Sequence, residues 1–473
     1  MDAHELDRED GGTLVEQVMA SIRERIAGRK AAPGAKLPSI RGLAGRMRVS
    51  KSTVVDAYDR LAAEGVIQSR RGSGFYVAGH LPPLSLARIG PRLDREVDPL
   101  WISRQSLEAG GDILKPGCGW LPASWMPEAG IRRALRLLAR SDRANLTDYG
   151  APLGLAPLRE LLSRRMAERG IEAPPHQIVL TESGTQAIDL VCRFLLEPGD
   201  TVLVDDPCYF NFHAMLHGHR ARIVSVPYTP TGPDLDLFAQ ALAEHRPRLY
   251  VTNSALHNPT GATLAPVVAH RLLRLAAQHD LLIVEDDIFA DFEHQPAPRL
   301  AAFDGLDRVI HIGSFSKTLS ASVRCGFIAA RADWIEGLVD LKLATSFGGG
   351  PFSAELVLEL LKDGTYRKHM EGLRARLAGA MGEAGTRLKA LGLVPWIEPR
   401  AGMFLWCKLP DGLDAANIAR HALSKGVVLA PGNAFSLSRS ASGFLRFNAA
   451  QSLDPAIFQA LERAMRKPGK TSA

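Results

Sequence analysis

The first regular hydrophobic pattern in the chain has a helical period. Thr13 and Glu16 are spaced as a capping box at a helix start. Apolar residues then recur four positions apart, at Leu14, Val18, Ile22 and Ile26. This pattern predicts an amphipathic helix that ends before Pro33-Gly34.

Two shorter helical patterns and a hairpin pattern follow. Ser39 and Ser50 are each placed to cap a helix, and the second of these helices has one apolar face. Apolar residues at 66–67 and 75–77 flank a glycine-containing turn, which predicts a β-hairpin. Residues 13–79 therefore predict a small α+β domain of three helices and a wing.

Residues 80–110 show no clear hydrophobic period. Prolines interrupt this stretch at Pro82, Pro83, Pro91 and Pro99. We therefore expect a partly extended linker over residues 80–110.

Short apolar runs alternate with helical stretches over much of residues 111–473. Seven runs are typical of buried strands: 177–181, 201–207, 221–227, 249–254, 281–287, 309–315 and 325–330. Because buried strands that alternate with helices form parallel sheets, we predict an α/β fold with a mostly parallel seven-stranded sheet. We expect a large domain at about 145–345 and a small α+β domain at about 346–473.

Composition limits the classes of protein. Hydrophobic residues make up 46% and charged residues 23% of the 473 residues, as in ordinary globular proteins. We find no apolar run of about 18 residues and no secretory signal pattern, so no membrane span is expected. The scattered cysteines argue against disulfides or a zinc site and favour the reducing cytosol. They are Cys118, Cys192, Cys208, Cys325 and Cys407.

The positive charge is confined to the N-terminal domain. Residues 13–79 hold 12 Lys and Arg against 5 Asp and Glu, whereas the whole chain has a net charge of only +6. This concentration indicates a polyanionic partner for that domain alone.

A winged three-helix domain places the first turn of its third helix in the major groove of DNA. That turn carries Lys51, Ser52 and Thr53, and the wing tip carries Arg70 and Arg71. Arginines at a wing tip can reach phosphates or the minor groove. A basic helical module for protein interaction is the alternative reading of the same pattern.

The sequence LPSIRGLAGRMRVSKSTVVDAYDRLAAEGVIQSRRGSGFYV resembles the winged helix of the GntR family of bacterial repressors. The match covers nearly all of residues 13–79. The resemblance implies binding to double-stranded operator DNA through Arg41, Ser52, Thr53, Arg70 and Gly72.

Polar residues follow most of the predicted strands of the larger domain. Ligands of such sheets bind at the carboxyl ends of the strands. The residues that follow are Ser183-Gly184-Thr185-Gln186, Tyr209, Asn258, the Glu285-Asp286-Asp287 cluster, and Ser314, Ser316, Lys317 and Arg324.

Each of these residues has a simpler explanation when it is taken alone. A glycine and a hydroxyl at a helix start can cradle a phosphate, but the same start also occurs without a ligand. Tyr209 can be a core residue, Asn258 can belong to a plain turn, and Lys317 can be a solvated charge. The carboxylates around Asp286 can be solvated, bind a metal or pair with a ring nitrogen.

Together these residues meet the needs of one cofactor. Pyridoxal phosphate requires a phosphate cradle, a carboxylate at its ring nitrogen, a donor to its ring oxygen, a stacking aromatic and an amine that forms a Schiff base. The order and spacing over residues 111–473 resemble the fold-type-I aminotransferases. The sequence therefore predicts pyridoxal 5'-phosphate as the cofactor.

The resemblance implies a role for each residue. Lys317 would form the internal aldimine, Asp286 would keep the ring nitrogen protonated, Asn258 would bind the ring oxygen, and Tyr209 would stack on the ring. Tyr149 would reach the cofactor of a partner subunit. The phosphate would be held by Gly184, Thr185, Ser314, Ser316 and Arg324, with Gln186 beside them.

Arg446, in GFLRFNAA, occupies the position at which these proteins grip a substrate carboxylate. A guanidinium suits that two-pronged contact, and a structural salt bridge is the alternative.

Two positions depart from the aminotransferase pattern. Phe289 stands where many aminotransferases have tyrosine three residues after the ring-nitrogen aspartate. Without that phenol we expect a raised aldimine pKa and weaker catalysis. The usual Pro-Gly between the lysine and the arginine is Ala321-Ser322 here, which changes backbone rigidity but no predicted contact.

A GntR-type domain joined to an aminotransferase-like body is similar to the MocR subfamily of bacterial transcription regulators. The resemblance implies a head-to-tail homodimer in the bacterial cytoplasm, at the nucleoid. An amino acid or amine would exchange with Lys317 at the aldimine and so alter DNA binding. Two alternatives are a functional aminotransferase with a DNA-binding domain, and a regulator whose effector is pyridoxal phosphate itself.

Overall fold

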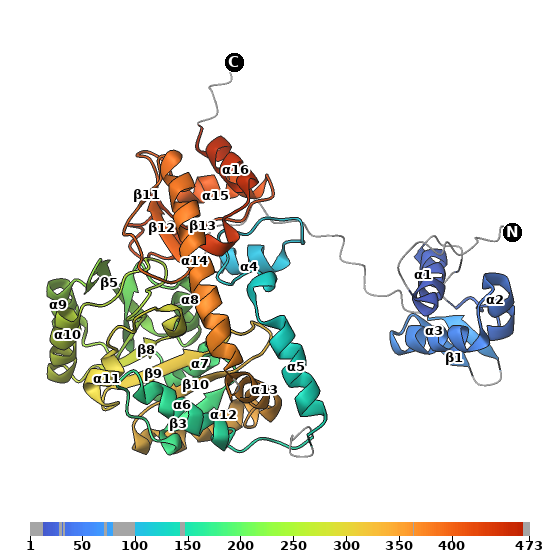
Figure 1. Ribbon diagram of the computed structural model, residues 1–473, viewed down its shortest axis with the longest axis horizontal. Helices are drawn as coiled ribbons and strands as arrows, with labels where there is room; N and C mark the ends of the chain where they lie inside the picture. Colours follow the sequence, from blue (N-terminus) through green and yellow to red (C-terminus); the bar gives the residue numbers. More distant parts are fainter. Residues whose placement is uncertain are drawn as a thin grey trace. The chain divides into compact units, whose positions relative to one another are not determined.

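The chain folds into two compact units, Met1–Gly90 and Pro91–Ala473. The computed structural model describes residues 13–27, 31, 34–70, 73–78, 100–141, 147–362 and 364–466 (Figure 1). Each unit is described by itself below, as the N-terminal unit and the C-terminal unit. No helix within these ranges is long and apolar enough to cross a membrane.

The N-terminal unit has the three helices and the hairpin that the sequence predicts. Ser39 caps the second helix, and Ser50 caps the third by accepting a hydrogen bond from Thr53 N at 3.0 Å. The buried core includes Val54 and Tyr58, and the Tyr58 hydroxyl donates to Pro38 O at 2.8 Å. The elements are α1 Leu14–Ala27, α2 Ile40–Met47, α3 Lys51–Ala63, β1 Ile67–Arg70 and β2 Gly74–Val77.

Part of the stretch expected to be a linker is folded. Residues Trp101–Glu108 form helix α4, whose Trp101 and Ile102 are buried in the core of the small domain. Leu114 also forms a β-bridge with Val427. The expectation of a linker over 80–110 is therefore wrong at its C-terminal end, because the proline-rich composition of 82–99 does not extend to the apolar helix that follows.

An eight-stranded sheet organises the large domain, one strand more than predicted. The extra strand β6 is only two residues long and pairs antiparallel with the end of β5. The order is β3-β10-β9-β8-β7-β4-β5-β6. The strands are β3 Ile178–Thr181, β4 Thr201–Asp206, β5 Arg222–Thr229, β6 Gly232–Pro233, β7 Leu249–Thr252, β8 Leu282–Asp286, β9 Val309–Ser314 and β10 Gly326–Ala329.

Strand β10 runs antiparallel to both of its neighbours, β9 and β3. A parallel connection needs a crossover of a dozen or more residues, usually through a helix. The loop from Phe315 to Cys325 is too short for this and returns the chain directly, pairing Gly326 with Ser314. This loop holds Lys317 at the carboxyl end of β9.

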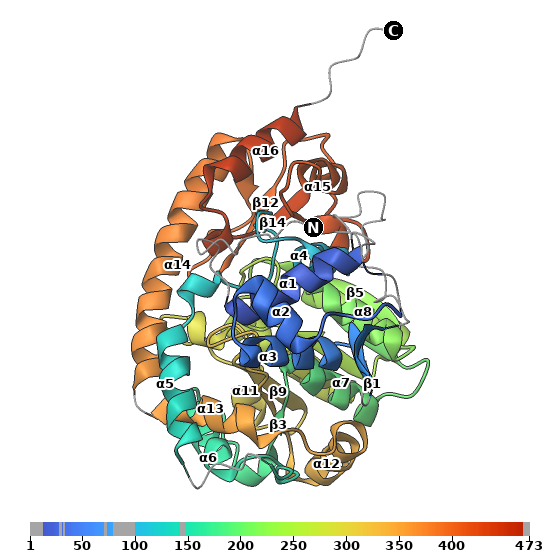
Figure 2. The same cartoon turned by 90° about the vertical axis from the view of Figure 1, so that its right-hand side faces the viewer.

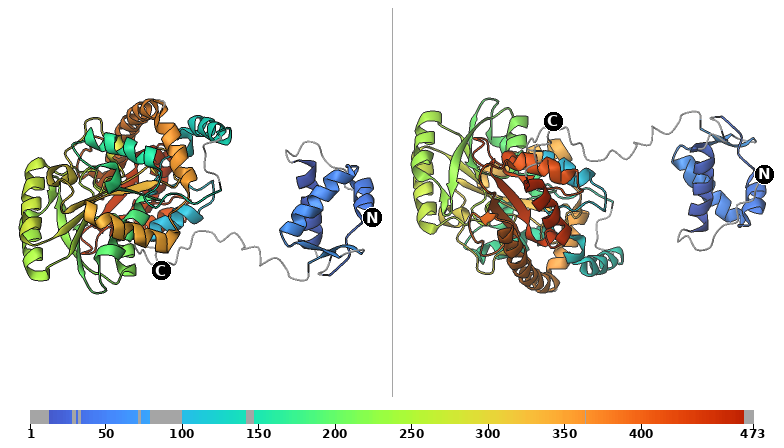
Figure 3. Two further views of the ribbon diagram at one scale, coloured as in Figure 1. Left: turned by 90° about the horizontal axis from the view of Figure 1, so that it is seen from below. Right: turned by 90° about the horizontal axis from the view of Figure 1, so that it is seen from above.

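Helices cover both faces of the sheet, as the buried strands require (Figure 3). Alternate residues point into separate cores, so that Leu180 lies in one and Val179 in the other. The helices of the large domain are α5 Glu128–Ala139, α6 Ala156–Ala167, α7 Gly184–Leu195, α8 Phe210–Gly218, α9 Leu235–His245, α10 Pro266–Gln278, α11 Leu300–Asp304, α12 Ala332–Ser346 and α13 Pro351–Lys362.

The small domain contains an antiparallel sheet in the order β11-β12-β14-β13. Its strands are β11 Val394–Pro395, β12 Phe404–Lys408, β13 Ala430–Pro431 and β14 Phe444–Asn448. Helix α14, Thr365–Ala390, runs along one side of the unit from α13 to this sheet (Figure 2). Helices α15 Ala415–Leu423 and α16 Pro455–Met465 pack on each other. Short 3-10 helices lie at Ala123–Trp125, Pro175–Gln177, Ala290–Phe292, Gly432–Ala434 and Ala449–Gln451.

Candidate functional site: a lysine cavity at the sheet edge

A cavity of about 110 Å³ lies at the carboxyl ends of β7, β8 and β9 in the C-terminal unit. Four of the residues predicted to bind a cofactor or substrate line it together: Tyr209, Asn258, Lys317 and Arg446. They come from four separate segments of the chain, so the fold alone brings them together.

Lys317 is partly buried in the loop between β9 and β10. Its Nζ donates a hydrogen bond to Gly119 O at 2.7 Å. Burial disfavours the charged ammonium and, together with the nearby Arg446, lowers the pKa of Lys317 to about 8. A lysine with a lowered pKa is a better nucleophile near neutral pH, because more of it is the free amine.

Asp286 ends strand β8 and is 2% exposed. Burial raises the pKa of Asp286 to about 7, although the amide of Asn253 and the Ile288 N–H favour its charged form. Among the described residues, no lysine, arginine or histidine forms an ion pair with this carboxylate. Within the described part of the chain, this buried carboxyl group therefore has no ion-pair partner.

Arg446 lies on β14 of the small domain and is fully buried. Its Nη1 donates to Asn258 Oδ1 at 2.7 Å, and its Nη2 donates to Gly117 O at 2.8 Å. The guanidinium carbon lies 4.2 Å from the ring centroid of Phe404 and 4.8 Å from that of Phe435. Burial lowers the pKa of Arg446 to about 10.

No carboxylate of a described residue pairs with Arg446, and its Nε has no hydrogen-bond partner. Burying an arginine without an anionic partner costs free energy, unless a bound ligand supplies the negative charge. The structural salt bridge that the sequence left open is absent among the described residues.

Tyr209 directly precedes helix α8 and follows β4. Its ring packs against Phe210 and Phe212, with centroid distances of 4.9 and 5.4 Å. Burial raises the pKa of Tyr209, so its phenol is neutral in the physiological range. The ring therefore belongs both to a core and to the cavity wall.

The start of helix α7 lies beside the end of β9. A Cβ added to Gly184 would meet Ile288 Cγ2 at 3.2 Å and Ser314 Cβ at 3.6 Å, so a larger residue would crowd this junction. Ser314 Oγ donates to Ser316 Oγ at 3.1 Å. The backbone N–H groups of a helix start together with these hydroxyls form a surface suited to an anion.

The other two residues of the predicted α7 cradle differ in exposure and in hydrogen bonding. Thr185 is exposed in the first turn of α7. Gln186 is engaged within the turn, because its Oε1 accepts from Glu182 N at 2.6 Å and its N donates to Ser183 Oγ at 3.1 Å.

Arg324 and Tyr149 line a second cavity, of about 300 Å³, and not the lysine cavity. Arg324 is exposed, and Tyr149 is 75% exposed with its ring 4.8 Å from that of Phe347. Lys342 also lines this second cavity, where its Nζ donates to Pro152 O at 2.7 Å.

Phe289 is buried in the wall of the lysine cavity, with its ring centroid 5.5 Å from that of Phe404. A phenyl ring therefore lines the cavity at the position where the sequence comparison expects a phenol. Ala321 and Ser322 lie in an exposed turn away from that wall.

Several lining residues escaped sequence reasoning. Ser103 and Ser106 of α4 line the lysine cavity, but they fall in the stretch that was expected to be a linker. Gly119 precedes the seven strands predicted for the larger domain and carries no side chain, so no pattern pointed to its carbonyl. Phe404, on β12, was not singled out from the sequence.

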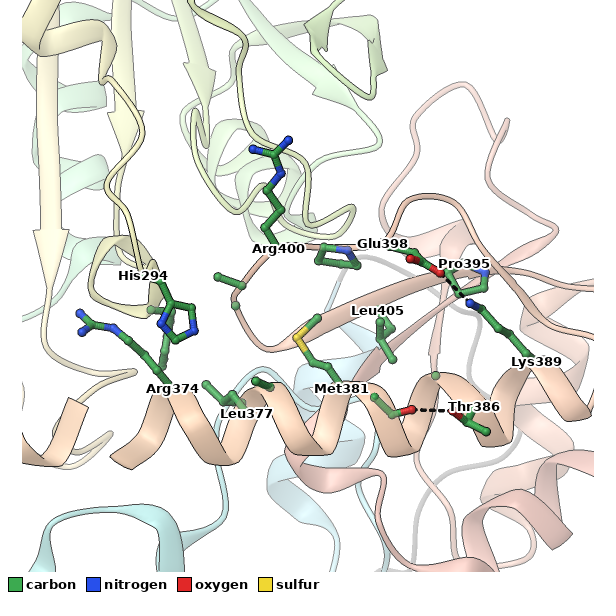
Figure 4. A pocket seen from close by; sticks show the side chains of 17 residues that line it. His294, Arg374, Leu377, Met381, Thr386, Lys389, Pro395, Glu398, Arg400 and Leu405 are labelled. Atoms are coloured by element: carbon green, nitrogen blue, oxygen red, sulfur yellow. Dashed lines mark hydrogen bonds and ion pairs between the residues drawn. The ribbon is translucent and has the colours of Figure 1, made fainter. Parts of the chain in front are cut away.

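A larger cavity, of about 370 Å³, lies between α14 and the segment 395–402 (Figure 4). His294, Arg374 and Met381 line it, and Arg374 Nε donates to Asp291 O at 2.9 Å. None of the residues singled out from the sequence lies in this cavity.

In the N-terminal unit, the predicted DNA-contacting residues lie at the starts of α2 and α3 and in the hairpin. Lys51 and Ser52 are exposed and Thr53 is partly exposed in the first turn of α3. Arg41 is exposed in the first turn of α2. Arg70 ends β1, whereas Arg71 and Gly72 lie outside the described residues.

Both units match known families. Residues 14–77 match the bacterial regulatory proteins of the gntR family, and residues 123–463 match aminotransferase class I and II. The HTH-type transcriptional regulator YdcR of Escherichia coli (strain K12) is 32% identical over 448 residues, which cover 92% of this chain and 94% of YdcR. The HTH-type transcriptional regulator NorG of Staphylococcus aureus (strain USA300) is 27% identical over 407 residues, covering 83% of this chain and 91% of NorG.

Solved structures similar to this chain include aminotransferases. LysN, the α-aminoadipate aminotransferase of Thermus thermophilus complexed with N-(5'-phosphopyridoxyl)-L-leucine, has a TM-score of 0.70 and 27% identity over 79% of this chain and 95% of its own. The kynurenine aminotransferase of Pyrococcus horikoshii in complex with PMP has a TM-score of 0.71 and 26% identity over 78% and 94%.

These relationships, together with the buried lysine and carboxylate at one sheet edge, identify pyridoxal phosphate as the cofactor of the C-terminal unit. The chain therefore belongs to the GntR-type transcriptional regulators that carry an aminotransferase class I and II domain, the architecture of the MocR subfamily.

Proposed function

We propose that this regulator senses an amino acid or amine in the lysine cavity and adjusts its binding to double-stranded operator DNA accordingly. The observation that carries the proposal is the convergence of Lys317, Asn258 and Arg446 on one cavity in a chain whose N-terminal unit is of GntR type.

The residues of the cavity fit pyridoxal phosphate. When bound, this cofactor supplies an electron-withdrawing ring and a carbonyl that reacts with amines. The Lys317 amine would be its covalent anchor. Asp286, which forms no ion pair with another described residue, would pair with the protonated ring nitrogen. The Asn258 amide would donate to the ring oxygen, and Tyr209 would stack on the ring.

An anion-binding surface for the phosphate extends from the start of α7 to the end of β9. The residues assigned to it are Gly184, Thr185, Gln186, Ser314, Ser316 and Arg324. The close approach of Gly184 to Ser314 supports the assignment of these two residues to one surface. Arg324 lines the neighbouring cavity, so its side chain would contact the phosphate from that side.

Arg446 would hold the carboxylate of an amino-acid effector. Its buried guanidinium has no anionic partner among the described residues, and its Nε makes no hydrogen bond there. Planar guanidinium groups bind carboxylates in a two-pronged manner. The effector amine would take the place of the Lys317 amine, which is then free to make other contacts.

An effector regulates only through its different affinities for two conformations. Arg446 comes from the small domain, whereas Lys317 and Asn258 come from the large domain. An effector that contacts all three would therefore favour one arrangement of the two domains. That preference is the proposed source of the altered DNA binding.

A head-to-tail homodimer would complete the site. Tyr149, Phe347 and Phe352 are 75%, 64% and 43% exposed, which is unusual for large apolar side chains. Tyr149 lines the cavity that contains Arg324, and its ring packs against that of Phe347. We propose that a second copy covers this surface and that Tyr149 reaches toward the partner's cofactor.

A functional aminotransferase is the second candidate, because the chain has a lysine, a ring-nitrogen aspartate and an arginine at the positions of the aminotransferase pattern. The phenyl ring of Phe289 weighs against efficient turnover, since no phenol is available there to the ring oxygen. A regulator whose effector is pyridoxal phosphate itself is a third candidate.

The deciding experiment is a visible-spectrum titration of the purified, cofactor-loaded chain with amino acids and amines. It is run alongside an assay for oxo-acid product and a DNA-binding assay at two salt concentrations. A stable spectral change without product, with altered affinity for a selected DNA sequence, is expected. Steady oxo-acid release with unchanged DNA affinity would contradict the sensor proposal and favour the enzyme.

A further inference from the structure

Helix α4 forms one wall of the lysine cavity. Ile102, Ser103 and Ser106 line the cavity together with Lys317 and Arg446. Ser106 lies three and four positions after Ser103 and Ile102, so these side chains share one face of the helix. Trp101 and Ile102 anchor the same helix in the core of the small domain. The wall is therefore a fixed element of the fold and not a loose flap.

The hydroxyl of Ser106 has no hydrogen-bond partner within the described part of the chain, although the residue is only 1% exposed. Buried polar atoms almost always find a partner, because leaving one unpaired is costly. Ile288, Phe289 and Phe404, which also line the cavity, have no polar side-chain atom to offer it. A hydroxyl group without a hydrogen bond to the described residues thus borders the cavity in which the effector is proposed to bind.

We propose that Ser106, with Ser103 beside it, hydrogen-bonds to the distal polar group of an amino-acid effector whose carboxylate is held by Arg446. This inference rests on the proposed function of the lysine cavity as an effector site. It narrows the effector class to α-amino acids with a hydroxyl or amide on a short side chain. An apolar side chain would fill the same space but leave the Ser106 hydroxyl without a hydrogen bond. Sites that hydrogen-bond a polar ligand group strongly reject analogues that lack this group.

The test uses the full-length, cofactor-loaded chain and two nearly isosteric pairs of amino acids. These pairs are L-threonine with L-valine and L-asparagine with L-leucine. Dissociation constants are measured from the visible spectrum for the native chain and for Ser106→Ala and Ser103→Ala. Arg104→Ala is the matched control, because Arg104 lies on the same helix but is exposed.

Ser106→Ala should weaken the binding of the polar member of at least one pair about 10-fold, the effect of one lost hydrogen bond. The apolar member should change by no more than about 2-fold, and Arg104→Ala should change neither. Ser103→Ala should produce a smaller effect of the same kind. Equal changes for both members of each pair, or no change, would overturn the assignment of Ser106 while leaving the sensor proposal intact.

Thermal unfolding of the effector-free protein separates this role from a structural one. Among the described residues the Ser106 hydroxyl has no hydrogen-bond partner to lose, so Ser106→Ala should unfold at the same temperature as the native chain or higher. A marked fall in the unfolding temperature would assign a structural role to Ser106 and overturn the proposal. If no amino acid changes the spectrum of the native chain, the effector-sensing function itself fails, and the role of Ser106 fails with it.

Discussion

Arg446 of the small domain donates a hydrogen bond to Asn258 Oδ1 of the large domain at 2.7 Å, with both side chains buried. The bond occupies the Asn258 oxygen and leaves its amide nitrogen as the donor. The same arginine therefore orients the proposed ligand of the cofactor ring and faces the proposed effector carboxylate. One side chain joins the two domains at the point where the ligand would bind.

Arg446→Lys should weaken the binding of carboxylate-bearing effectors. Lysine keeps the positive charge but loses the two-pronged geometry, so L-alanine should bind about 10- to 100-fold more weakly. Ethylamine, which lacks the carboxylate, should change by no more than about 3-fold. Dissociation constants from the visible spectrum test this. A parallel loss for both compounds would mean that Arg446 acts on the cofactor and not on the carboxylate.

Lys317→Ala should abolish covalent attachment of the cofactor. Lys342 offers a matched control, because burial lowers the pKa of both lysines to about 8 but only Lys317 lies in the cavity with Asn258. Borohydride reduction followed by peptide mass analysis should show the added mass on the Lys317 peptide in the native chain and in Lys342→Met. Labelling of the Lys342 peptide instead would refute the assignment.

The stability of the cofactor-free protein should fall as pH rises from about 4 to about 7. Burial raises the pKa of Asp286 from 3.8 to about 7, so the folded protein retains a proton that the unfolded chain has lost across this window. Asp286 then contributes stability below pH 4 that is lost by pH 7, at most about 4 kcal/mol.

Urea unfolding at pH 5 and pH 8 measures this effect. Asp286→Asn should reduce the difference between the two pH values, whereas Asp411→Asn, at a 95% exposed side chain, should not. Loading with pyridoxal phosphate should also reduce the difference, because a protonated ring nitrogen would favour the charged carboxylate. An undiminished difference in Asp286→Asn would assign the pH dependence to other groups.

Arg41→Ala should weaken binding to DNA and lower its salt dependence. Arg41 is exposed at the start of α2, and one lost phosphate contact lowers the slope of log affinity against log salt by about 1. Arg60→Ala is the control variant, because the Arg60 side chain already forms an ion pair with Asp56 on α3, with an N–O distance of 3.0 Å. Fluorescence anisotropy over a range of salt concentrations tests both variants. An identical slope in Arg41→Ala and the native chain would place Arg41 away from the phosphates.

The sequence was informative wherever a local pattern decides the structure. The caps at Ser39 and Ser50 and the seven apolar runs correspond to observed helices and strands, because capping and burial act over a few residues. The direction of β10 depends on how its neighbours pair across the sheet. The two-residue strand β6 is likewise too short to leave a pattern.

Sequence reasoning placed the candidate site residues at one edge of the sheet, but it did not separate those that line the lysine cavity from those that line the next cavity. Tyr209, Asn258, Lys317 and Arg446 share a cavity, whereas Arg324 borders the next one. Whether a side chain reaches one cavity or its neighbour depends on tertiary packing that no local spacing encodes. The same holds for Ser106, whose place in the cavity follows from how α4 docks on the small domain.

Helix α4 belongs to two parts of the C-terminal unit at once. Its Trp101 and Ile102 are buried in the core of the small domain, and its Ser103 and Ser106 line the lysine cavity. A substitution that repacks this core would therefore also reshape the cavity wall, although no atom of the substituted side chain touches the ligand.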